Sequence, residues 1–435
     1  MTQPTFSPIA IVEVELSQAV PDLPRVDAQG RAHGSAWVLV RLHGTPLGLL
    51  RVTLPLDARG LADRIDEELG AARAAHEATD GAGQPPACVA ARDAFLAAAP
   101  PMSVLIPTRD RPERLERALR SILAGDYPSG RYEILCVDNA PSTDATRRVV
   151  DALAGEGAPV RYAREDATGS ASARNAGLPL LDTDLVAMTD DDVIVDEHWL
   201  TEIARGFGAA EGVAAVSGLL LPGELETPAQ VWFEEYGGFS RGFERQVYDL
   251  EEHRPAGMPL YPWSAGIFGT GNNFAFHRPT LQAIGAFDPA LGNGTPALGG
   301  VDSEALLRTI LTGHRIVYQP TALVWHLHRP DLEGLRRQIY AYGAGLTGQL
   351  VKTMLAEPRL LPDLLKRVPR GVRFALSPGS EKNTGKSAGY PADLTRLELK
   401  GMLYGPLGYA RSRRRYGGHA AARHAYRERR RAAGR

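Results

Sequence analysis

The chain has 435 residues, enough for two or three domains that each bury a core of their own. Its 49 basic and 51 acidic residues nearly balance, which argues against a dedicated nucleic-acid-binding protein. Cys88 and Cys136 are the only cysteines. They are too few and too far apart for a disulfide framework or a zinc cluster, and this usage suits a reducing cytoplasm.

The two ends of the chain differ in charge. Residues 1–8 have neither the basic nor the apolar region of a signal peptide, and no stretch approaches the roughly 18 apolar residues of a membrane-spanning helix. We therefore expect the protein to be made and kept in the cytoplasm. From Arg411 to Arg435 there are ten arginines and one acid, Glu428, which predicts a cationic tail.

Residues 1–98 predict a small α+β accessory domain without visible chemistry. Apolar runs at 9–14 and 36–42 are typical of strands. One helical face then carries the apolar residues Leu61, Ile65, Leu69 and Ala72. Pro100-Pro101 marks the expected domain boundary.

From Met102 onward, short apolar runs alternate with helical segments, which is the pattern of βαβ units in a parallel sheet. Predicted strands span 103–107, 133–138, 160–162 and 186–188, with predicted helices at 111–124, 144–154 and from Ser170. Ligands of such sheets bind at the carboxyl ends of the strands. Polar residues follow three of these strands, at 108–110, 138–139 and 190–192, which predicts a shared nucleotide site.

The apolar run 186–188 leads into three consecutive carboxylates, Asp190, Asp191 and Asp192. Side chains alternate along an extended chain, so Asp190 and Asp192 are expected to point the same way. Two hard oxygen ligands on one side suit Mg²⁺ or Mn²⁺. A solvated acidic turn or a helix N-terminus remains the other interpretation of this stretch.

The second half of the chain is less regular. Residues 222–263 form an aromatic-rich insertion, which predicts either a binding loop or an apolar extension of the core. Further predicted elements are a strand at 271–276, helices from Pro279 and Asp302, strands at 315–318 and 322–326, and helices within 330–372. A loop at 377–390 is expected to precede the cationic tail.

Residues 102–345 resemble the family 2 inverting glycosyltransferases of the GT-A fold. The resemblance rests on the order and spacing of Val104 to Arg111, Val137 to Asn139, Gly169 to Gly177, Asp190 to Asp192, Gly271 to Asn273, Gly285 to Asp288, Gly299 to Glu304 and Val324 to Arg329. It implies an α/β fold with a Rossmann-like mixed sheet flanked by helices. The expected domains are an accessory domain at 1–98, the catalytic domain at 99–345 and a helical C-terminal extension at 346–435.

The resemblance also implies a nucleoside-diphosphate-sugar donor. It assigns donor binding to Pro107, Thr108, Arg109, Asp138, Arg174, Asp190, Asp191 and Asn273. A carboxylate at Asp138 can accept the imino proton of a pyrimidine, although a turn-capping role is the alternative. Arg174, expected near the start of a helix, would face the diphosphate, and a surface arginine is the alternative.

A divalent cation, Mn²⁺ or Mg²⁺, is implied as the cofactor because the leaving group is a nucleoside diphosphate. The resemblance assigns it to Asp192 and Asp190, with His326 as a third ligand and His328 in reserve. Inversion needs one general base, and Asp302 is the candidate, with Glu304 supporting it or binding the acceptor. The glycines at 299–300 would let the backbone approach a ligand closely. Val301 departs from the usual Glu-Asp pair, so the roles of Asp302 and Glu304 stay open.

The expected acceptor is a glycan, a lipid-linked molecule or a small molecule, and no nucleic acid is expected as a partner. The arginine tail predicts a possible peripheral contact with the inner face of the cell membrane. One alternative is a nucleotidyltransferase, which more naturally carries a glycine-rich loop with lysine after the first strand. The other is a polyanion-binding protein that uses the tail.

Overall fold

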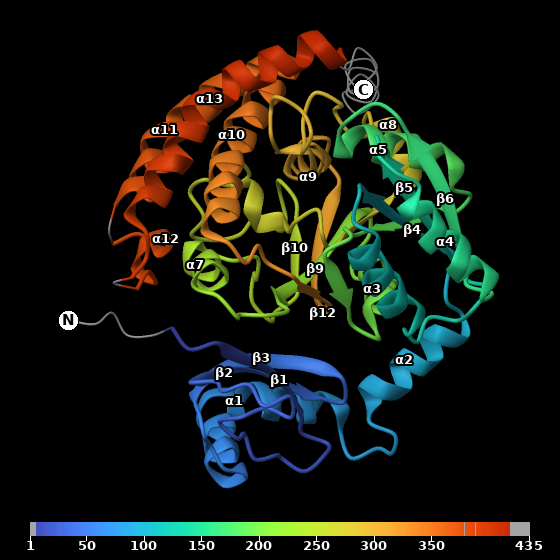
Figure 1. Cartoon of the computed structure of the whole chain (residues 1–435), viewed down its shortest axis with the longest axis vertical. Helices are drawn as coiled ribbons and strands as arrows, with labels where there is room; N and C mark the ends of the chain where they lie inside the picture. Colours follow the sequence, from blue (N-terminus) through green and yellow to red (C-terminus); the bar gives the residue numbers. More distant parts are fainter. Residues whose placement is uncertain (1–5, 378, 388, 418–435) are drawn as a thin grey trace.

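The computed structural model describes residues 6–377, 379–387 and 389–417. The N-terminal unit contains a three-stranded sheet of β1 (Ile9–Glu15), β2 (Ser35–Leu42) and β3 (Thr45–Thr53). Helix α1 (Ala58–Asp80) packs Leu61 and Ile65 against this sheet, and α2 (Ala87–Ala97) leads away from it. The unit has its own apolar core and lies below the main sheet in Figure 1.

Within the described residues, nine strands form the main sheet, in the order β10-β12-β9-β11-β7-β4-β5-β6 with β8 paired to β12. Their bounds are β4 (Met102–Thr108), β5 (Tyr132–Asn139), β6 (Val160–Glu165), β7 (Leu185–Met188), β8 (Val193–Val195), β9 (Val213–Pro222), β10 (Gln246–Tyr248), β11 (Phe274–His277) and β12 (Arg315–His326). Strands β4 to β7 pair in parallel, whereas β11 runs antiparallel to β7 and β9. The sheet is therefore mixed, as the resemblance predicted.

Helices cover both faces of this sheet (Figure 1). Their bounds are α3 (Pro112–Leu123), α4 (Ala145–Gly155), α5 (Ser170–Gly177), α6 (Trp199–Phe207), α7 (Pro228–Tyr236), α8 (Arg278–Ala283) and α9 (Val301–Leu311), with 3-10 turns η1 (Leu178–Leu180) and η2 (Ala265–Phe268). Helices α3, α4 and α6 share one apolar core, and α5 and α9 share the other. Strand β4 is buried along its whole length, which explains its unbroken apolar run.

The C-terminal region is helical, with α10 (Leu332–Ala356), η3 (Pro358–Leu360), α11 (Leu361–Leu376), α12 (Glu381–Thr384) and α13 (Ala392–Tyr416). Two expectations need correction. Helix α10 runs unbroken through the boundary expected at 345–346, and residues 411–416 belong to α13 rather than to a tail. The remaining tail, 418–435, lies outside the described residues. None of the described helices has the length and apolar character needed to cross a membrane.

Helices α10 and α13 touch backbone to backbone. A Cβ added at Gly343 of α10 would lie 2.1 Å from the carbonyl oxygen of Glu398, and one at Gly401 of α13 would lie 2.1 Å from that of Tyr340. Glycine permits this approach because it has no side chain. The long α13 is thus held along α10, on the upper left of Figure 1.

Candidate active site

The three aspartates lie in the turn that joins β7 to β8, at the carboxyl edge of the parallel strands. The expected extended segment, with Asp190 and Asp192 on one side, is therefore wrong. Each carboxylate meets different partners: Asp190 meets Arg174, Asp191 meets Thr108, and Asp192 meets His326. The turn spreads three acidic groups over three neighbouring elements.

Asp190 is held by a buried arginine. Nη2 of Arg174 lies 3.2 Å from Oδ1 of Asp190 and donates to the carbonyl oxygen of Gly271 at 3.3 Å. Arg174 is 3% exposed and sits in the last turn of α5, not at its start as expected. Burial raises the pKa of Asp190, with Asp192 and Asp191 adding to the shift, although Arg174 opposes it. A cation bound close to Asp190 would therefore favour the deprotonated carboxylate.

Asp191 is bonded within the protein. Its Oδ2 accepts a hydrogen bond of 2.7 Å from the Thr108 hydroxyl at the end of β4, and its Oδ1 lies 3.0 Å from Nη1 of Arg111. Burial raises the pKa of Asp191. Thr108 thus fixes the aspartate turn, whereas the neighbouring Arg109 is half exposed. Sequence reasoning missed the role of Arg111.

Asp192 has an unused acceptor. Its Oδ1 is buried, makes no hydrogen bond among the described residues and lies 3.5 Å from Nε2 of His326. His326 ends β12 and is 5% exposed. Burial keeps the pKa of His326 well below its usual value, so the ring is neutral. A buried carboxylate oxygen facing a neutral imidazole fits a divalent cation.

The ring of His326 is the first of three side chains in contact with one another, and the last of them is the carboxylate of Glu234. The Nδ1 atoms of His326 and His328 lie 2.7 Å apart, and Nε2 of His328 lies 2.7 Å from Oε1 of Glu234. We assign the tautomers from these contacts. With both rings neutral, His328 donates to Glu234 and accepts from Nδ1 of His326, which leaves Nε2 of His326 unprotonated and facing Asp192.

Glu234 comes from α7, inside the aromatic insertion that the sequence left as either a loop or a core extension. Phe233 and Phe239 of this segment contact the ring of His328 at centroid distances of 4.6 and 6.1 Å. The insertion therefore packs as core and also supplies a polar side chain to the site. No sequence pattern pointed to Glu234, because its contact with His328 spans 94 positions.

Asp138 lies at the end of β5 and is fully buried. The hydroxyl of Tyr162 donates to its Oδ2 at 3.1 Å, whereas Oδ1 has no hydrogen-bond partner among the described residues. Burial raises the pKa of Asp138, although Tyr162 and Thr146 oppose the shift. An unpaired buried acceptor of this kind is suited to a donor on a ligand.

Asp302 and Glu304 lie in the first turn of α9 in different surroundings. Oδ2 of Asp302 accepts from the backbone N–H of Gly271 at 2.7 Å, close to Arg174. Glu304 is 1% exposed and forms ion pairs with Arg308, at 3.0 Å, and Lys352. Burial alone would raise the pKa of Glu304, but the two cations outweigh burial and lower this pKa to about 2. Of these two residues, only Asp302 has a carboxylate oxygen without a hydrogen-bond or ion-pair partner among the described residues.

The glycines before Asp302 allow close contact with another helix, and not with a ligand as expected. A Cβ added at Gly300 would lie 2.5 Å from the carbonyl oxygen of Gly345, in α10. The backbone of α10, and not a ligand, therefore requires Gly300. Its φ of +84° is a second reason for glycine. The C-terminal region thus positions the start of α9 and, with it, Asp302.

Asn273 has a structural role, unlike the donor contact expected from the sequence. Its Nδ2 donates to the carbonyl oxygens of Leu219 and Ala322, and its Oδ1 accepts from Nε1 of Trp199. The residue is fully buried and ties β9 to β12. Pro107, likewise expected at the donor, lies inside the buried strand β4.

In the described part of the chain, two groups of three or more potential metal ligands converge within 4.8 Å, and both lie outside this site. Asp192 and His326 thus form a preformed pair, while Asp190 is turned toward Arg174.

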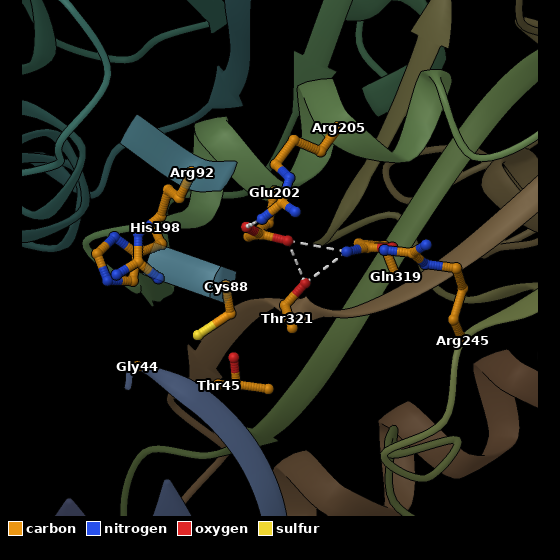
Figure 2. A pocket seen from close by; sticks show the side chains of 10 residues that line it. All are labelled: Gly44, Thr45, Cys88, Arg92, His198, Glu202, Arg205, Arg245, Gln319 and Thr321. Carbon is orange, nitrogen blue, oxygen red and sulfur yellow. Dashed lines mark hydrogen bonds and ion pairs between the residues drawn. The ribbon is translucent and has the colours of Figure 1, made fainter. Parts of the chain in front are cut away.

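A cavity of about 180 Å³ lies away from this site, where the N-terminal unit meets α6 and β12 (Figure 2). Polar side chains that line it form hydrogen bonds with one another. Gln319, for example, donates to Glu202 at 2.8 Å.

Comparison with known proteins agrees with this architecture. Residues 103–249 match the family described as Glycosyl transferase family 2. The chain therefore contains a segment similar to this family. The matched segment runs from β4 to β10 and includes Asp138, Arg174 and all three aspartates.

The chain is similar to two curated relatives. It is 26% identical over 317 residues to the pre-mycofactocin glycosyltransferase of Mycobacterium tuberculosis, covering 71% of this chain and 58% of the relative. It is 24% identical over 233 residues to the glucosyl-dolichyl phosphate glucuronosyltransferase of Haloferax volcanii, covering 52% of this chain and 68% of the relative. The chain thus spans less than two thirds of the mycobacterial relative.

Two solved structures are similar at low sequence identity. One is a mannosyltransferase from Pyrobaculum calidifontis with GDP-mannose and Mn²⁺, at 18% identity and a TM-score of 0.46, covering 74% of this chain and 96% of that one. The other is GalNAc-T7 with UDP, GalNAc and Mn²⁺, at 16% identity and a TM-score of 0.39, covering 57% and 50%.

Proposed function

We propose that the protein is a metal-dependent inverting glycosyltransferase that moves a sugar from a nucleoside-diphosphate sugar to an acceptor hydroxyl. The observation that carries the proposal is the buried, unpaired Oδ1 of Asp192, 3.5 Å from Nε2 of His326. The match of residues 103–249 to family 2 supports the reaction class over a nucleotidyltransferase or a polyanion-binding protein.

Asp192 and His326 would hold the cation, with Asp190 beside them. A hard carboxylate with an imidazole suits Mn²⁺ or Mg²⁺. When bound, the ion supplies positive charge that stabilises the departing diphosphate. Glu234 and His328 orient the ring of His326, and Arg111 and Thr108 fix the turn that carries Asp192.

Asp138 would bind the base of the donor. Its unpaired Oδ1 can accept a hydrogen bond, and its raised pKa also allows the protonated carboxyl to donate one. Arg109, half exposed beside the end of β4, is proposed to contact the same nucleotide. Arg174 is bonded to Asp190, so we assign it to positioning that carboxylate and to the charge balance of the diphosphate site.

Asp302 would be the general base. The N–H of Gly271 fixes one carboxylate oxygen, which leaves the other to accept the proton of the acceptor hydroxyl. Glu304 is unsuited to this task because its pKa is about 2 and both of its partners are cations. We assign Glu304 to holding α9 in place through its ion pairs with Arg308 and Lys352.

The acceptor is proposed to carry a free hydroxyl on a glycan, a lipid-linked molecule or a small molecule. Helix α11 supports a contact with a membrane surface. Its exposed apolar residues Leu361, Leu365, Val368, Val372 and Leu376 recur with helical spacing. The exposed Lys366, Arg370 and Arg373 lie on the same helix. An apolar stripe flanked by cations fits an anionic lipid surface.

Co-sedimentation with anionic phosphatidylglycerol vesicles tests this contact. Val368→Glu should reduce the bound fraction several-fold, because it places a charge in the apolar stripe. Leu403→Glu is the matched control, since Leu403 is 83% exposed but lies on α13. Equal binding of wild-type protein and Val368→Glu would remove α11 as the contact.

Hydrolysis and transfer assays with a panel of nucleoside-diphosphate sugars test the reaction itself. The wild-type protein should cleave at least one donor when Mn²⁺ is added, and far more slowly without it. A sugar product of inverted anomeric configuration is expected. Cleavage of no donor under any metal condition, or a retained configuration, would contradict the proposal.

A further inference from the structure

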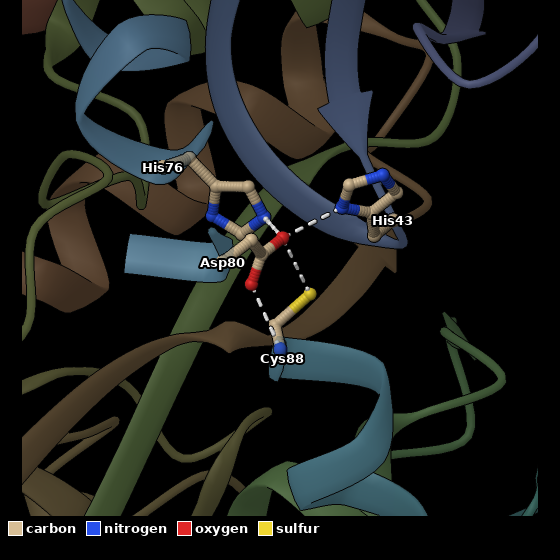
Figure 3. A group of neighbouring side chains, drawn as sticks. All are labelled: His43, His76, Asp80 and Cys88. Atoms are coloured by element: carbon tan, nitrogen blue, oxygen red, sulfur yellow. Dashed lines mark hydrogen bonds and ion pairs between the residues drawn. The ribbon is translucent and has the colours of Figure 1, made fainter. Parts of the chain in front are cut away.

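A group of metal-ligating side chains lies in the N-terminal unit, away from the aspartate turn (Figure 3). It consists of His43 from the β2–β3 turn, His76 and Asp80 from α1, and Cys88 from the first turn of α2. Figure 3 shows the four side chains converging on the Asp80 carboxylate. Their ligand atoms all lie within 4.8 Å of one another.

The spacing of these atoms is close to that of a four-coordinate site. Oδ2 of Asp80 lies 2.7 Å from Nδ1 of His43, 3.1 Å from Nε2 of His76 and 3.1 Å from Sγ of Cys88. Ligand atoms around a tetrahedral zinc ion stand about 3.3 to 3.6 Å apart. Outward shifts of a few tenths of an ångström would therefore admit the ion.

The backbone builds this arrangement from three separate segments. His43 has a φ of +55°, and the Glu15 carboxylate fixes its turn by accepting from the N–H groups of His43 and Gly44 at 2.9 Å. His76 and Asp80 are four residues apart on α1 and share one face. The backbone N–H of Cys88 donates to Oδ1 of Asp80 at 2.8 Å. The ligand atoms are thus oriented without an ion.

Hydrogen bonding alone leaves the group incomplete. Nε2 of His76 is buried and has no hydrogen-bond partner among the described residues, although it faces Oδ2 of Asp80. That oxygen is approached by three groups at once, and Asp80 is 5% exposed. Burial and the neighbouring Asp80 raise the pKa of the Cys88 thiol to about 11, so the sulfur is protonated without a metal.

We propose that His43, His76, Asp80 and Cys88 bind one zinc ion as a structural site. Two imidazoles and a thiolate favour zinc over the hard cations suited to Asp192. A thiolate and a carboxylate balance the two positive charges of the ion, and binding releases the thiol proton to water. The sequence argued against a zinc cluster because it has two cysteines, but histidines and an aspartate provide the other three ligands.

Zinc would tie α2 to the β2–β3 turn and to α1 within the N-terminal unit, close to where this unit meets the catalytic domain. The carbonyl oxygen of His43 accepts from Arg92 of α2, and a Cβ added at Gly44 would lie 2.9 Å from Nε2 of His198, just before α6. Cys88 also lines the cavity between the two parts (Figure 2), which provides an approach for the ion. Loss of zinc is expected to loosen this junction.

Metal content and cobalt spectra of the full chain, made without a histidine tag, test the proposal. Wild-type protein grown with zinc should keep about one zinc per chain after dialysis. Co²⁺ added to the metal-free protein should give a thiolate-to-cobalt absorption band in the near ultraviolet. Cys88→Ser should abolish that band, and His76→Ala should weaken zinc binding at least about tenfold.

Two controls separate this site from other causes. Cys136→Ala should keep the cobalt band, since Cys136 is buried in β5. Asp192→Asn should keep the zinc, so a failure of the proposed transferase site would not affect this result. Wild-type protein that gives no thiolate band, or Cys88→Ser with unchanged zinc affinity, would overturn the proposal. If Cys88→Ser does not fold, zinc must still raise the melting temperature of the wild-type chain, and an unchanged temperature would overturn it.

Discussion

Asp302 and Glu304 are two positions apart on α9, yet their surroundings give them opposite properties. Asp302 is half-buried and touches the backbone of Gly271, at the edge of the site. Glu304 is enclosed and neutralised by Arg308 and Lys352. A general base must be open to its substrate and have a pKa suited to accepting a proton. The contacts of each residue therefore favour Asp302 as the proposed base.

Asp302→Asn should reduce turnover by a factor of about 10² to 10⁴ and leave donor affinity and the melting temperature nearly unchanged. The amide cannot accept the proton of the acceptor, but it can still accept the hydrogen bond from Gly271. Steady-state kinetics with calorimetric donor binding would measure both. Near-normal turnover of this variant would refute the assignment.

Glu304→Gln should instead reduce stability, by about 3 kcal/mol, because it leaves Arg308 and Lys352 without their shared anion. The sign of the pH dependence follows from the lowered pKa. The ion pairs stabilise the fold fully above the ordinary carboxyl pKa of 4.5, and this contribution disappears as the pH falls toward 2. Denaturant titrations at several pH values would show the difference between wild type and variant shrinking below pH 4.5. A variant as stable as wild type at neutral pH would contradict this role.

His326→Ala should weaken Mn²⁺-dependent nucleotide binding more than His328→Ala or Glu234→Gln does. The last two act through the orientation of His326, and losses of about 10- to 100-fold are typical of such residues. His253→Ala is the control, since His253 is bonded to Asp249 away from the site. If His328→Ala were the most damaging, His328 would be the ligand.

The sequence located the polar residues at the strand ends, because strand order alone brings them to one edge. Asp138 and Asp192 lie there as expected, and His326, which the resemblance assigned to the metal, lies next to Asp192. The sequence could not show which of them are already bonded to the protein. Several side chains expected at the donor instead form hydrogen bonds with other residues of the protein, namely Arg174, Thr108 and Asn273. Such pairings depend on side-chain directions that only the folded chain defines.

At the scale of elements, α10 connects the C-terminal helices to the start of α9. A Cβ at Gly345 would lie 2.7 Å from the backbone nitrogen of Gly300 and 2.8 Å from the carbonyl carbon of Gly299. Backbone atoms cannot move aside as flexible side chains can. The position of Asp302 therefore depends on a helix that the expected domain boundary would have divided.

Gly345→Ala should lower stability by about 1 to 3 kcal/mol and reduce turnover, because α9 must shift. Gly348→Ala is the matched control on the same helix, where the added Cβ would meet its nearest atom, the carbonyl oxygen of Gly405, at an ordinary 3.5 Å. Alanine favours a helix over glycine, so this control should be neutral or slightly stabilising. Melting temperatures and turnover numbers would separate the two variants. Equal behaviour would show that the α9–α10 contact is not required.

Apolar periodicity predicted the strands β4, β5 and β7 and the helices between them, because each buries a regular face. The expected helical character of the C-terminal region is confirmed, but apolar periodicity did not locate α13, whose inward face is built from glycines such as Gly401 and Gly405 rather than from large apolar residues. It also placed the aspartates on an extended segment, since a turn between two short strands has no apolar period.

Over the whole molecule, the two proposed metal sites differ in the chemical type of their ligands. The aspartate turn offers hard oxygen ligands beside one imidazole, and the N-terminal unit offers a thiol and two imidazoles. The segment that matches family 2 includes the aspartate turn. The account depends on that turn more than on any other feature.

The most direct test is calorimetric binding of a panel of nucleoside diphosphates to wild-type protein and Asp192→Asn, with and without added Mn²⁺. Wild type should bind at least one nucleotide much more tightly when Mn²⁺ is present. Asp192→Asn should lose this metal dependence, because the amide removes a charged ligand. The control Asp166→Asn, at an exposed carboxylate paired with Arg164, should retain it. Unchanged Mn²⁺-dependent affinity in Asp192→Asn would contradict the account.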